Sequence, residues 1–330
     1  MKPGARLLVS KFELGFDPSL GVTETAFQLT SLRPPRFAPE LIRLLRVAGK
    51  TDLIFISNPK FPELIFTWLA KKLCRHPPRV VLFDLILRAP RSTVQKLLAP
   101  FQRRMLRAAD RIVFIHRDTS GYERLFGVTR EQVSYVPFKA NNFDLRDAFA
   151  AADGDYVVAL GASHRDYRLL IEAVAGTAIP LKIILPRASV LAHNADLGTG
   201  ELPPNVEHVD TAVDRMAWSR YMAHSRFVVV PLLPDVLQPA GISVYLEAMV
   251  LGKPVVITRG SSTEGILDDQ LAVIVPAGDS QAMRQALVRL WNDAQKRRQL
   301  AARSRAYALA LRDHGRLVED LRKVVESCVR

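Results

Sequence analysis

A single carboxylate, Glu247, lies within a mostly apolar stretch, QPAGISVYLEAMVLGKPVVIT, that runs from residue 238 to residue 258. We expect a helix to begin near Ser243 and to end at Gly252, because glycine often follows the last turn of a helix. Ser243 and Glu247 are four residues apart and therefore share one face of this helix. There the carboxylate of Glu247 can accept two hydrogen bonds from a ribose diol, or it can bond a backbone amide or an arginine of the protein itself. The spacing leaves both interpretations open.

The residues just before this helix are suited to binding an anion. They follow a predicted strand, Phe227–Leu233, and the ligands of open α/β sheets bind beyond the carboxyl ends of the strands. The first amides of a helix have no acceptor within it, and the helix dipole adds partial positive charge there. We therefore predict a phosphate site formed by the backbone amides of Gly241, Ile242, Ser243 and Val244.

Apolar runs rich in β-branched and aromatic residues alternate with amphipathic helical patterns along the whole chain, and this is typical of parallel sheets covered on both faces. The rhythm stops at residues 141–155, which resemble a linker, and then restarts. We predict an α/β protein with two doubly wound, Rossmann-like domains, 1–150 and 151–310, and a final helix at 311–330 that packs across them. The predicted strands are Arg6–Ser10, Asp52–Ser57, Arg79–Asp84, Arg111–His116 and Val133–Phe138, then Tyr156–Gly161, Leu181–Pro186, Val206–Asp210, Phe227–Leu233, Lys253–Thr258 and Leu271–Ala277.

Several common cofactor and nucleophile motifs do not occur in the sequence. Neither half has a GxGxxG after its first strand, which disfavours a nicotinamide or flavin enzyme. There is no Walker A sequence and no GxSxG nucleophile elbow. The two cysteines, Cys74 and Cys328, and the seven histidines lack metal-ligand spacing. We therefore predict neither a metal ion nor a cofactor.

Positive charge is concentrated in the first half of the chain. Residues 1–150 contain 25 Lys and Arg against 13 Asp and Glu, whereas residues 151–330 contain 21 against 20. This asymmetry indicates that one half meets an anionic surface, either phospholipid or nucleic acid, unless it reflects a genome rich in arginine. Basic and aromatic residues do not interleave as in a nucleic-acid module, so we predict a membrane surface or a lipid-linked acceptor and no nucleic acid.

The segment Lys96–Arg111, KLLAPFQRRMLRAADR, is a basic amphipathic pattern in this half. It can lie on anionic lipid, or its apolar side can pack on the core while its polar side is solvated. No stretch approaches the roughly 20 apolar residues of a membrane span, and the apolar run near the N-terminus is too short for a signal peptide. We expect a cytoplasmic location, either fully soluble or peripheral at the inner membrane face.

The order of these motifs resembles GT-B glycosyltransferases, most closely glycosyltransferase family 4 and its group 1 relatives. Between residues 227 and 290 the resemblance is carried by SVYLEAMVLGKPVVIT and LAVIVPAGDSQAMRQAL, and it is looser over YVVALGASHRDYRLLIEAV. In the first half, RAADRIVFIHRDTSGYERLFGVTREQVSYVP is similar to a run of the same family, whereas the first hundred residues match little beyond the fold. The resemblance implies a GT-B fold, in which an acceptor domain and a nucleotide-sugar domain face a central cleft.

The resemblance also implies roles for single residues. Glu247 matches the glutamate that holds the nucleotide ribose, and Pro239 stands where the family has a second glutamate beside the donor sugar. In the family an arginine and a lysine after the first strand of the donor domain hold the diphosphate. Here Ala162 replaces that arginine next to Gly161, which we assign to the donor site.

Other cations near these positions can take over the diphosphate. His164 and Arg165 follow Gly161 closely, and Arg187 ends a later strand. A guanidinium can hold phosphate oxygens with two parallel hydrogen bonds, although Arg165 can also pair with Asp166 at the surface. In the first half, Asp84 ends a predicted strand and resembles an acceptor-side residue, or it caps a helix.

We therefore predict a metal-independent, hexosyl-type glycosyltransferase that uses a nucleotide-diphosphate sugar. The resemblance implies a retaining reaction, in which the leaving diphosphate takes the acceptor proton, with Asp84, His164 and Arg165 as the catalytic candidates. The expected acceptor is lipid-linked or a polysaccharide precursor at the inner membrane face. The alternative, which Pro239 motivates, is a catalytically silent GT-B-like protein that binds a nucleotide sugar or a partner.

Overall fold

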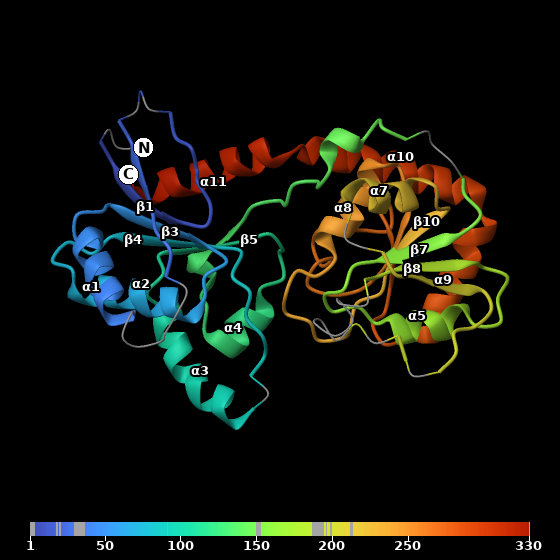
Figure 1. Cartoon of the computed structure of the whole chain (residues 1–330), viewed down its shortest axis with the longest axis horizontal. Coiled ribbons are helices and arrows are strands. Elements are labelled where there is room, and N and C mark those ends of the chain that lie inside the picture. Colours follow the sequence, from blue (N-terminus) through green and yellow to red (C-terminus); the bar gives the residue numbers. More distant parts are fainter. Residues whose placement is uncertain are drawn as a thin grey trace. The chain divides into compact units, whose positions relative to one another are not determined.

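The computed structural model describes the chain except for residues 1–3, 18, 20, 30–36, 91, 150–152, 187–194, 196, 199, 212–213 and 330. The chain divides into two compact units (Figure 1). Unit 1 consists of Met1–Ile115, Thr119–Pro137 and Leu317–Arg330, and unit 2 consists of His116–Asp118 and Phe138–Arg316. The end of the chain therefore returns to unit 1. The predicted limits of the acceptor domain (1–150), the donor domain (151–310) and the final helix (311–330) stay a prediction.

Unit 1 contains a six-stranded, all-parallel sheet in the order β2-β1-β3-β4-β5-β6. Strand β2 lies in the long junction after β1, where its sequence, TETA, has no apolar run and is mostly exposed, and it was therefore not predicted. The strands are β1 (Arg6–Ser10), β2 (Thr23–Ala26), β3 (Leu53–Ser57), β4 (Arg79–Phe83), β5 (Arg111–Phe114) and β6 (Val133–Tyr135), and the helices are α1 (Phe37–Ala48), α2 (Phe61–Leu73), α3 (Thr93–Leu106), α4 (Ser120–Phe126), the short η2 (Arg130–Gln132) and most of α11 (His314–Val329).

Unit 2 contains a second six-stranded parallel sheet, in the order β12-β11-β10-β7-β8-β9. The chain adds β8 and β9 on one side of β7 and then β10, β11 and β12 on the other, so the strand order reverses between β7 and β10. Ligands of doubly wound sheets bind at this switch point. The strands are β7 (Val157–Leu160), β8 (Leu181–Ile184), β9 (Val206–Val209), β10 (Phe227–Val230), β11 (Val255–Thr258) and β12 (Val273–Val275), and the helices are η3 (Phe143–Leu145), α5 (Tyr167–Val174), α7 (Arg215–Ala223), α8 (Ile242–Val250), α9 (Ser280–Asn292) and α10 (Ala294–Leu311).

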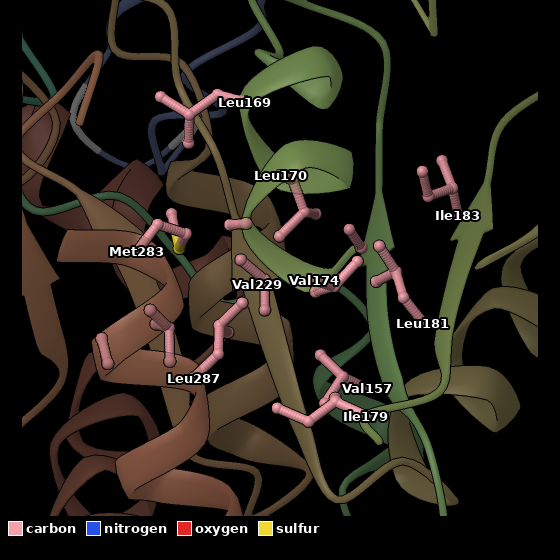
Figure 2. Close-up of a cluster of buried hydrophobic side chains, with 14 of the residues drawn as sticks. Val157, Leu169, Leu170, Val174, Ile179, Leu181, Ile183, Val229, Met283 and Leu287 are labelled. Carbon is pink, nitrogen blue, oxygen red and sulfur yellow. The ribbon is translucent and has the colours of Figure 1, made fainter. Parts of the chain in front are cut away.

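The core of unit 2 lies between its sheet and the helices α5 and α9. Val157 and Ala159 of β7, like Leu181 and Ile183 of β8, alternate along their strands and point to the same face. Leu170 and Val174 of α5 and Met283 and Leu287 of α9 meet them there, and all of these side chains are fully buried (Figure 2). Their alternates on the strands, such as Val158 and Val228, are buried on the opposite face. Burial on both faces explains why these strands are continuous apolar runs in the sequence.

The predicted fold class, α/β with two doubly wound Rossmann-like domains, is confirmed. One local difference lies near the end of the chain, where the charged helical pattern after Lys296 divides into α10 and α11. Arg312, between the two helices, has a left-handed backbone with φ of 58°. A non-glycine residue adopts this conformation rarely, and it ends α10 abruptly.

Candidate functional site

The amino-terminal end of α8 offers the backbone amides that the sequence predicted. The helix begins at Ile242 after Gly241, which has φ of 89° and provides no side chain to cap the helix. Among the described residues, none accepts a hydrogen bond from the amides of Gly241, Ile242, Ser243 or Val244, and the first amide to find a backbone acceptor is that of Tyr245. A helix end without a cap needs an external partner, and its dipole favours an anion.

Gly241 is fitted to its position by the strand beneath it. A Cβ atom at Gly241 would lie 2.8 Å from Cγ1 of the buried Val230 and 3.5 Å from Cδ2 of Leu232. The positive φ and this close contact both require glycine. The start of α8 is therefore held directly against the carboxyl end of β10.

A buried cation, Arg165, lies in the loop that follows β7. Its side chain is only 4% exposed. The guanidinium donates hydrogen bonds to the carbonyl oxygens of Leu160 (3.2 Å, from Nε) and Ser163 (2.8 Å, from Nη1). It forms no ion pair with any carboxylate of the described residues, and burial lowers the pKa of Arg165. A buried charge without a counter-ion is costly, so an anionic ligand is the partner that would relieve it.

The loop around Arg165 is shaped by two further residues. Gly161 has φ of 94°, and a Cβ atom there would lie 2.9 Å from Nη2 of Arg165. Tyr167 donates a hydrogen bond of 2.5 Å to the carbonyl oxygen of Gly161. Asp166 accepts from the amide of Leu169 and caps α5, so the surface pair of Arg165 with Asp166 is wrong.

Arg165 and the start of α8 belong to the same edge of the sheet in unit 2. β7 and β10 are hydrogen-bonded neighbours, with Val158 opposite Val228. Past their ends, Arg165 forms an isolated antiparallel bridge with Leu232, and Leu232 is the residue whose side chain Gly241 approaches. The amides and the buried guanidinium are therefore brought together at the switch point of the strand order.

Glu247 is buried on α8 and is held by two residues distant in sequence. Its Oε1 atom accepts hydrogen bonds from Ser219 Oγ (2.6 Å) and from Asn142 Nδ2 (2.8 Å). These partners differ from the backbone amide or arginine considered from the sequence. Burial raises the pKa of Glu247, against the lowering effect of the two hydrogen bonds and of nearby Arg215. No described residue donates to Oε2, which leaves one carboxylate oxygen available for a ligand hydroxyl.

The other predicted residues of unit 2 have different outcomes. His164 has φ of 57°, and its Nδ1 atom lies 2.9 Å from Ser163 Oγ, in the same loop as Arg165. Pro239 precedes α8 and contributes no carboxylate there. Arg187 lies outside the described residues.

In unit 1, Asp84 lies at the carboxyl edge of the sheet, within a group of polar residues. It follows β4 with φ of 51°, its amide donates to the carbonyl oxygen of Val113 (3.0 Å), and burial raises the pKa of its carboxyl group while Lys60 lowers it. Next to it, at the ends of β1 and β3, Lys11 and Asn58 also have left-handed backbones, with φ of 62° and 46°.

A buried glutamate organises this group in unit 1. Glu63 is fully buried and accepts from Ser10 Oγ (2.9 Å), Lys11 Nζ (2.7 Å) and the amide of Lys60 (2.8 Å). The ammonium group of Lys60 donates to Asn58 Oδ1 (3.0 Å). Glu63 thus positions two lysines at the edge where Asp84 lies.

Backbone strain is concentrated at these two edges. Left-handed non-glycine residues cost about 1 kcal/mol or more each and tend to occur at functional sites. Within the described part of the chain they are Lys11, Asn58, Asp84, Asn142, His164, Asp235 and Arg312. All except Arg312 lie in the loops after parallel strands or, as Asn142 does, against Glu247.

Sequence reasoning missed Asn142, Ser219, Lys11 and Glu63. Asn142 falls in the stretch interpreted as a linker, and Ser219 is one serine in a short helix. The only sequence signal was in the pattern KFPE, where the Glu63 carboxylate accepts from the backbone amide of Lys60 and so caps the start of α2.

The described residues contain no group of three or more His, Cys, Asp or Glu side chains arranged to hold a metal ion. None of their helices combines the length and the apolar character needed to cross a bilayer.

Comparison with known proteins adds the family. Residues 16–139 match the model of the "Glycosyl transferase 4-like domain", and residues 166–293 match the model "Glycosyl transferases group 1". No curated protein matches the chain significantly.

Among solved structures the chain is similar to HepE of Anabaena in complex with UDP, with 14% identity, 98% of this chain and 100% of that chain covered, and a TM-score of 0.69. It is also similar to a glycosyltransferase of Rickettsia africae, with 9% identity, 99% of each chain covered and a TM-score of 0.68. A UDP-forming trehalose-phosphate synthase of Burkholderia xenovorans has 13% identity over 89% of this chain and 80% of that chain, with a TM-score of 0.60. The two domain matches follow one another along most of the chain, and the chain belongs to the GT-B glycosyltransferases of the group 1 and family 4-like type.

Proposed function

We propose that this glycosyltransferase takes its sugar from a nucleoside-diphosphate sugar bound to unit 2. The observation that carries the proposal is the buried guanidinium of Arg165, which has no acidic partner among the described residues and lies at the same sheet edge as the uncapped start of α8. A diphosphate supplies the anion that both groups require. The complex of the similar HepE structure with UDP-glucose is consistent with such a donor.

In this proposal the remaining residues orient the nucleotide. The Oε2 atom of Glu247 accepts from the ribose hydroxyls, while Asn142 and Ser219 hold the carboxylate through Oε1. A carboxylate fixed by two hydrogen bonds loses little freedom when it binds the ribose, which favours affinity.

The transfer itself breaks the bond between the anomeric carbon and the diphosphate oxygen and forms a bond between that carbon and an acceptor oxygen. Arg165 and the amides of α8 stabilise the negative charge that grows on the leaving diphosphate. The acceptor proton passes to that diphosphate. The reaction retains the configuration at the anomeric carbon, and the donor sugar is a hexose. The cations of the chain, and not a metal ion, neutralise the charge of the diphosphate.

We place the acceptor in unit 1, at the edge formed by Lys11, Asn58, Lys60 and Asp84. Two observations support this placement. Lys11, Asn58 and Asp84 have a strained, left-handed backbone, and the buried Glu63 holds Lys11 in position. The excess of basic residues in the first half supports an acceptor that is lipid-linked or a polysaccharide precursor, presented at an anionic membrane surface.

Calorimetry tests the donor site first. We would titrate the protein with UDP, GDP and ADP, and we expect one of them to bind with an affinity that falls at least about tenfold in Glu247→Gln. Binding of none of the three, or equal binding by the variant, refutes the donor site as assigned.

Turnover is then measured with the matching nucleotide sugar and a membrane extract. Release of nucleoside diphosphate that depends on the extract supports transfer, and the anomeric proton of the product gives the stereochemistry. Pro239, which stands where the family has a glutamate, favours a second candidate, a silent protein that binds the nucleotide sugar without turnover. Tight binding with no release in any extract would identify that candidate.

A further inference from the structure

Helix α3 of unit 1 exposes an apolar stripe to solvent. Val94 is 65% exposed, Leu97 75%, Leu98 42% and Phe101 38%. Their spacing of three, four and seven residues from Val94 places them on one face of the helix, the face that normally packs on a core. Single exposed apolar residues are ordinary, but a contiguous set on one helix face marks an interaction surface.

The stripe is exposed because α3 extends beyond the unit that anchors it. At its carboxyl end Met105 and Leu106 are buried, at 1% and 0% exposure. The ring of Phe101 still contacts Phe61 and Trp68 of α2, with centroids 6.3 Å and 5.8 Å apart. Before Phe101 the helix projects past α2 and α4, with its amino-terminal end farthest from the sheet (Figure 1).

The projecting part packs little, since Ala99 is its one buried residue, and its start is stabilised by a cap of its own. Ser92 accepts a hydrogen bond from the amide of Gln95 (3.2 Å), and Gln95 Oε1 accepts one from the amide of Ser92 (3.1 Å). This capping box satisfies two donors at the helix start. The chain thus presents Val94, Leu97 and Leu98 on an ordered helix and not on a frayed end.

The charge on α3 and on the segments that flank it in sequence has one sign. Between Leu85 and Ala109 the sequence contains no aspartate or glutamate, while its lysines and arginines are Arg88, Arg91, Lys96, Arg103, Arg104 and Arg107. Asp110, which follows, is already paired with Lys71 (2.5 Å) and Arg79 (2.7 Å). Exposed leucines next to a run of lysines and arginines complement an anionic bilayer, in which acyl chains lie beneath negative headgroups.

We propose that α3 is a membrane-docking helix that inserts Val94, Leu97 and Leu98 into the interface of an anionic bilayer while the surrounding cations meet the headgroups. The surface is small, three to four side chains over two turns, which suits interfacial insertion better than a stable protein interface of about 1,000 Å² or more. The proposal deepens the proposed function and rests on it only for its purpose, the delivery of unit 1 to a membrane-bound acceptor.

Sedimentation with large unilamellar vesicles tests this docking. We expect the protein to bind vesicles of phosphatidylcholine with about 30% phosphatidylglycerol at low salt, and to bind pure phosphatidylcholine weakly. The double variant Leu97→Ser/Leu98→Ser should bind the anionic vesicles about tenfold less or weaker. Lys96→Gln/Arg104→Gln should bind less at low salt and depend less on salt. Val288→Ser, which changes a residue 37% exposed on α9 of unit 2, is the matched control and should bind as the native protein does.

Further measurements separate the outcomes. Circular dichroism confirms that the variants fold, and Leu97→Trp should show a blue-shifted fluorescence on adding anionic vesicles. No binding by the native protein, equal binding by the leucine variant, or a dimer in light scattering that the leucine variant dissociates would each overturn the proposal. Nucleoside-diphosphate affinity should be unchanged in Leu97→Ser/Leu98→Ser, and vesicle binding should be unchanged in Glu247→Gln. Failure of the donor site and failure of the docking helix are therefore distinguishable.

Discussion

Replacing Arg165 with methionine tests whether the buried guanidinium serves an anion or only supports its loop. The substitution keeps much of the side-chain volume but removes the charge and the hydrogen bonds to Leu160 (3.2 Å) and Ser163 (2.8 Å). Hydrogen bonds from a charged donor contribute about 1.5–3 kcal/mol each, so the two together contribute several kcal/mol. Against this, an ion buried without a counter-ion carries a penalty of several kcal/mol, and burial does lower the pKa of Arg165.

The two terms nearly cancel in the ligand-free protein. We therefore expect the unfolding free energy of Arg165→Met without ligand to stay within about 1 kcal/mol of the native value or to rise. In the presence of a diphosphate the balance changes, because the native guanidinium gains a charged, two-point partner. Loss of the guanidinium in Arg165→Met should weaken nucleoside-diphosphate binding about 100-fold, which corresponds to about 2.7 kcal/mol.

Urea unfolding followed by circular dichroism gives the first quantity, and calorimetry with UDP gives the second. Arg168→Met is the matched control, since Arg168 is an exposed arginine of α5 in the adjoining turn, and it should change UDP affinity less than threefold. A stability loss above about 3 kcal/mol in Arg165→Met together with unchanged UDP affinity would refute the reasoning. Arg165 would then be a loop support alone.

Three further predictions follow from buried groups of unit 2. Burial raises the pKa of Glu247, so folding favours binding of a proton there. The stability of the native protein should therefore fall as pH rises through the folded-state pKa. In thermal melts, Glu247→Gln should remove this dependence of the melting temperature on pH. Gly241→Ala should lower the unfolding free energy by roughly 1–3 kcal/mol through its positive φ and the contact with Val230, whereas Gly260→Ala, whose Cβ atom would meet no atom within 4 Å, should change it little. Burial lowers the pKa of Lys253 to about 8 from 10.5, so the unfolded chain binds more protons than the native protein between those pH values. The unfolding free energy should therefore rise with pH in this range. Urea titrations should show that Lys253→Met loses this rise, and an equal rise in both proteins would contradict the prediction.

The strands and the fold class could be predicted from the sequence because burial on both faces makes a strand of this fold a continuous apolar run. Strand β2 could not be predicted, since it is a short and polar edge strand. The start of α8 was predicted to within one residue, because glycine and the following apolar periodicity are local signals.

The candidate site was predicted in part. Glu247 stood out as one carboxylate in an apolar helix, but its partners Asn142 and Ser219 are 105 and 28 residues away in sequence. No local pattern marks either of them. The pairing of Arg165 with Asp166 was the local alternative to a phosphate-binding role, and it is wrong because Asp166 caps α5 and the side chain of Arg165 turns back under Gly161.

The sequence by itself therefore determined what depends on neighbours along the chain: the alternation of strands and helices, the uncapped start of α8 and the excess of basic residues in the first half. Only the tertiary structure decided which strands adjoin, and with that the meeting of Arg165 and α8 where the order reverses between β7 and β10. It also decided that the apolar stripe of α3 continues past its anchor into solvent. These properties depend on contacts between residues far apart in sequence, and burial and electrostatic pairing are set by such contacts and not by local periodicity.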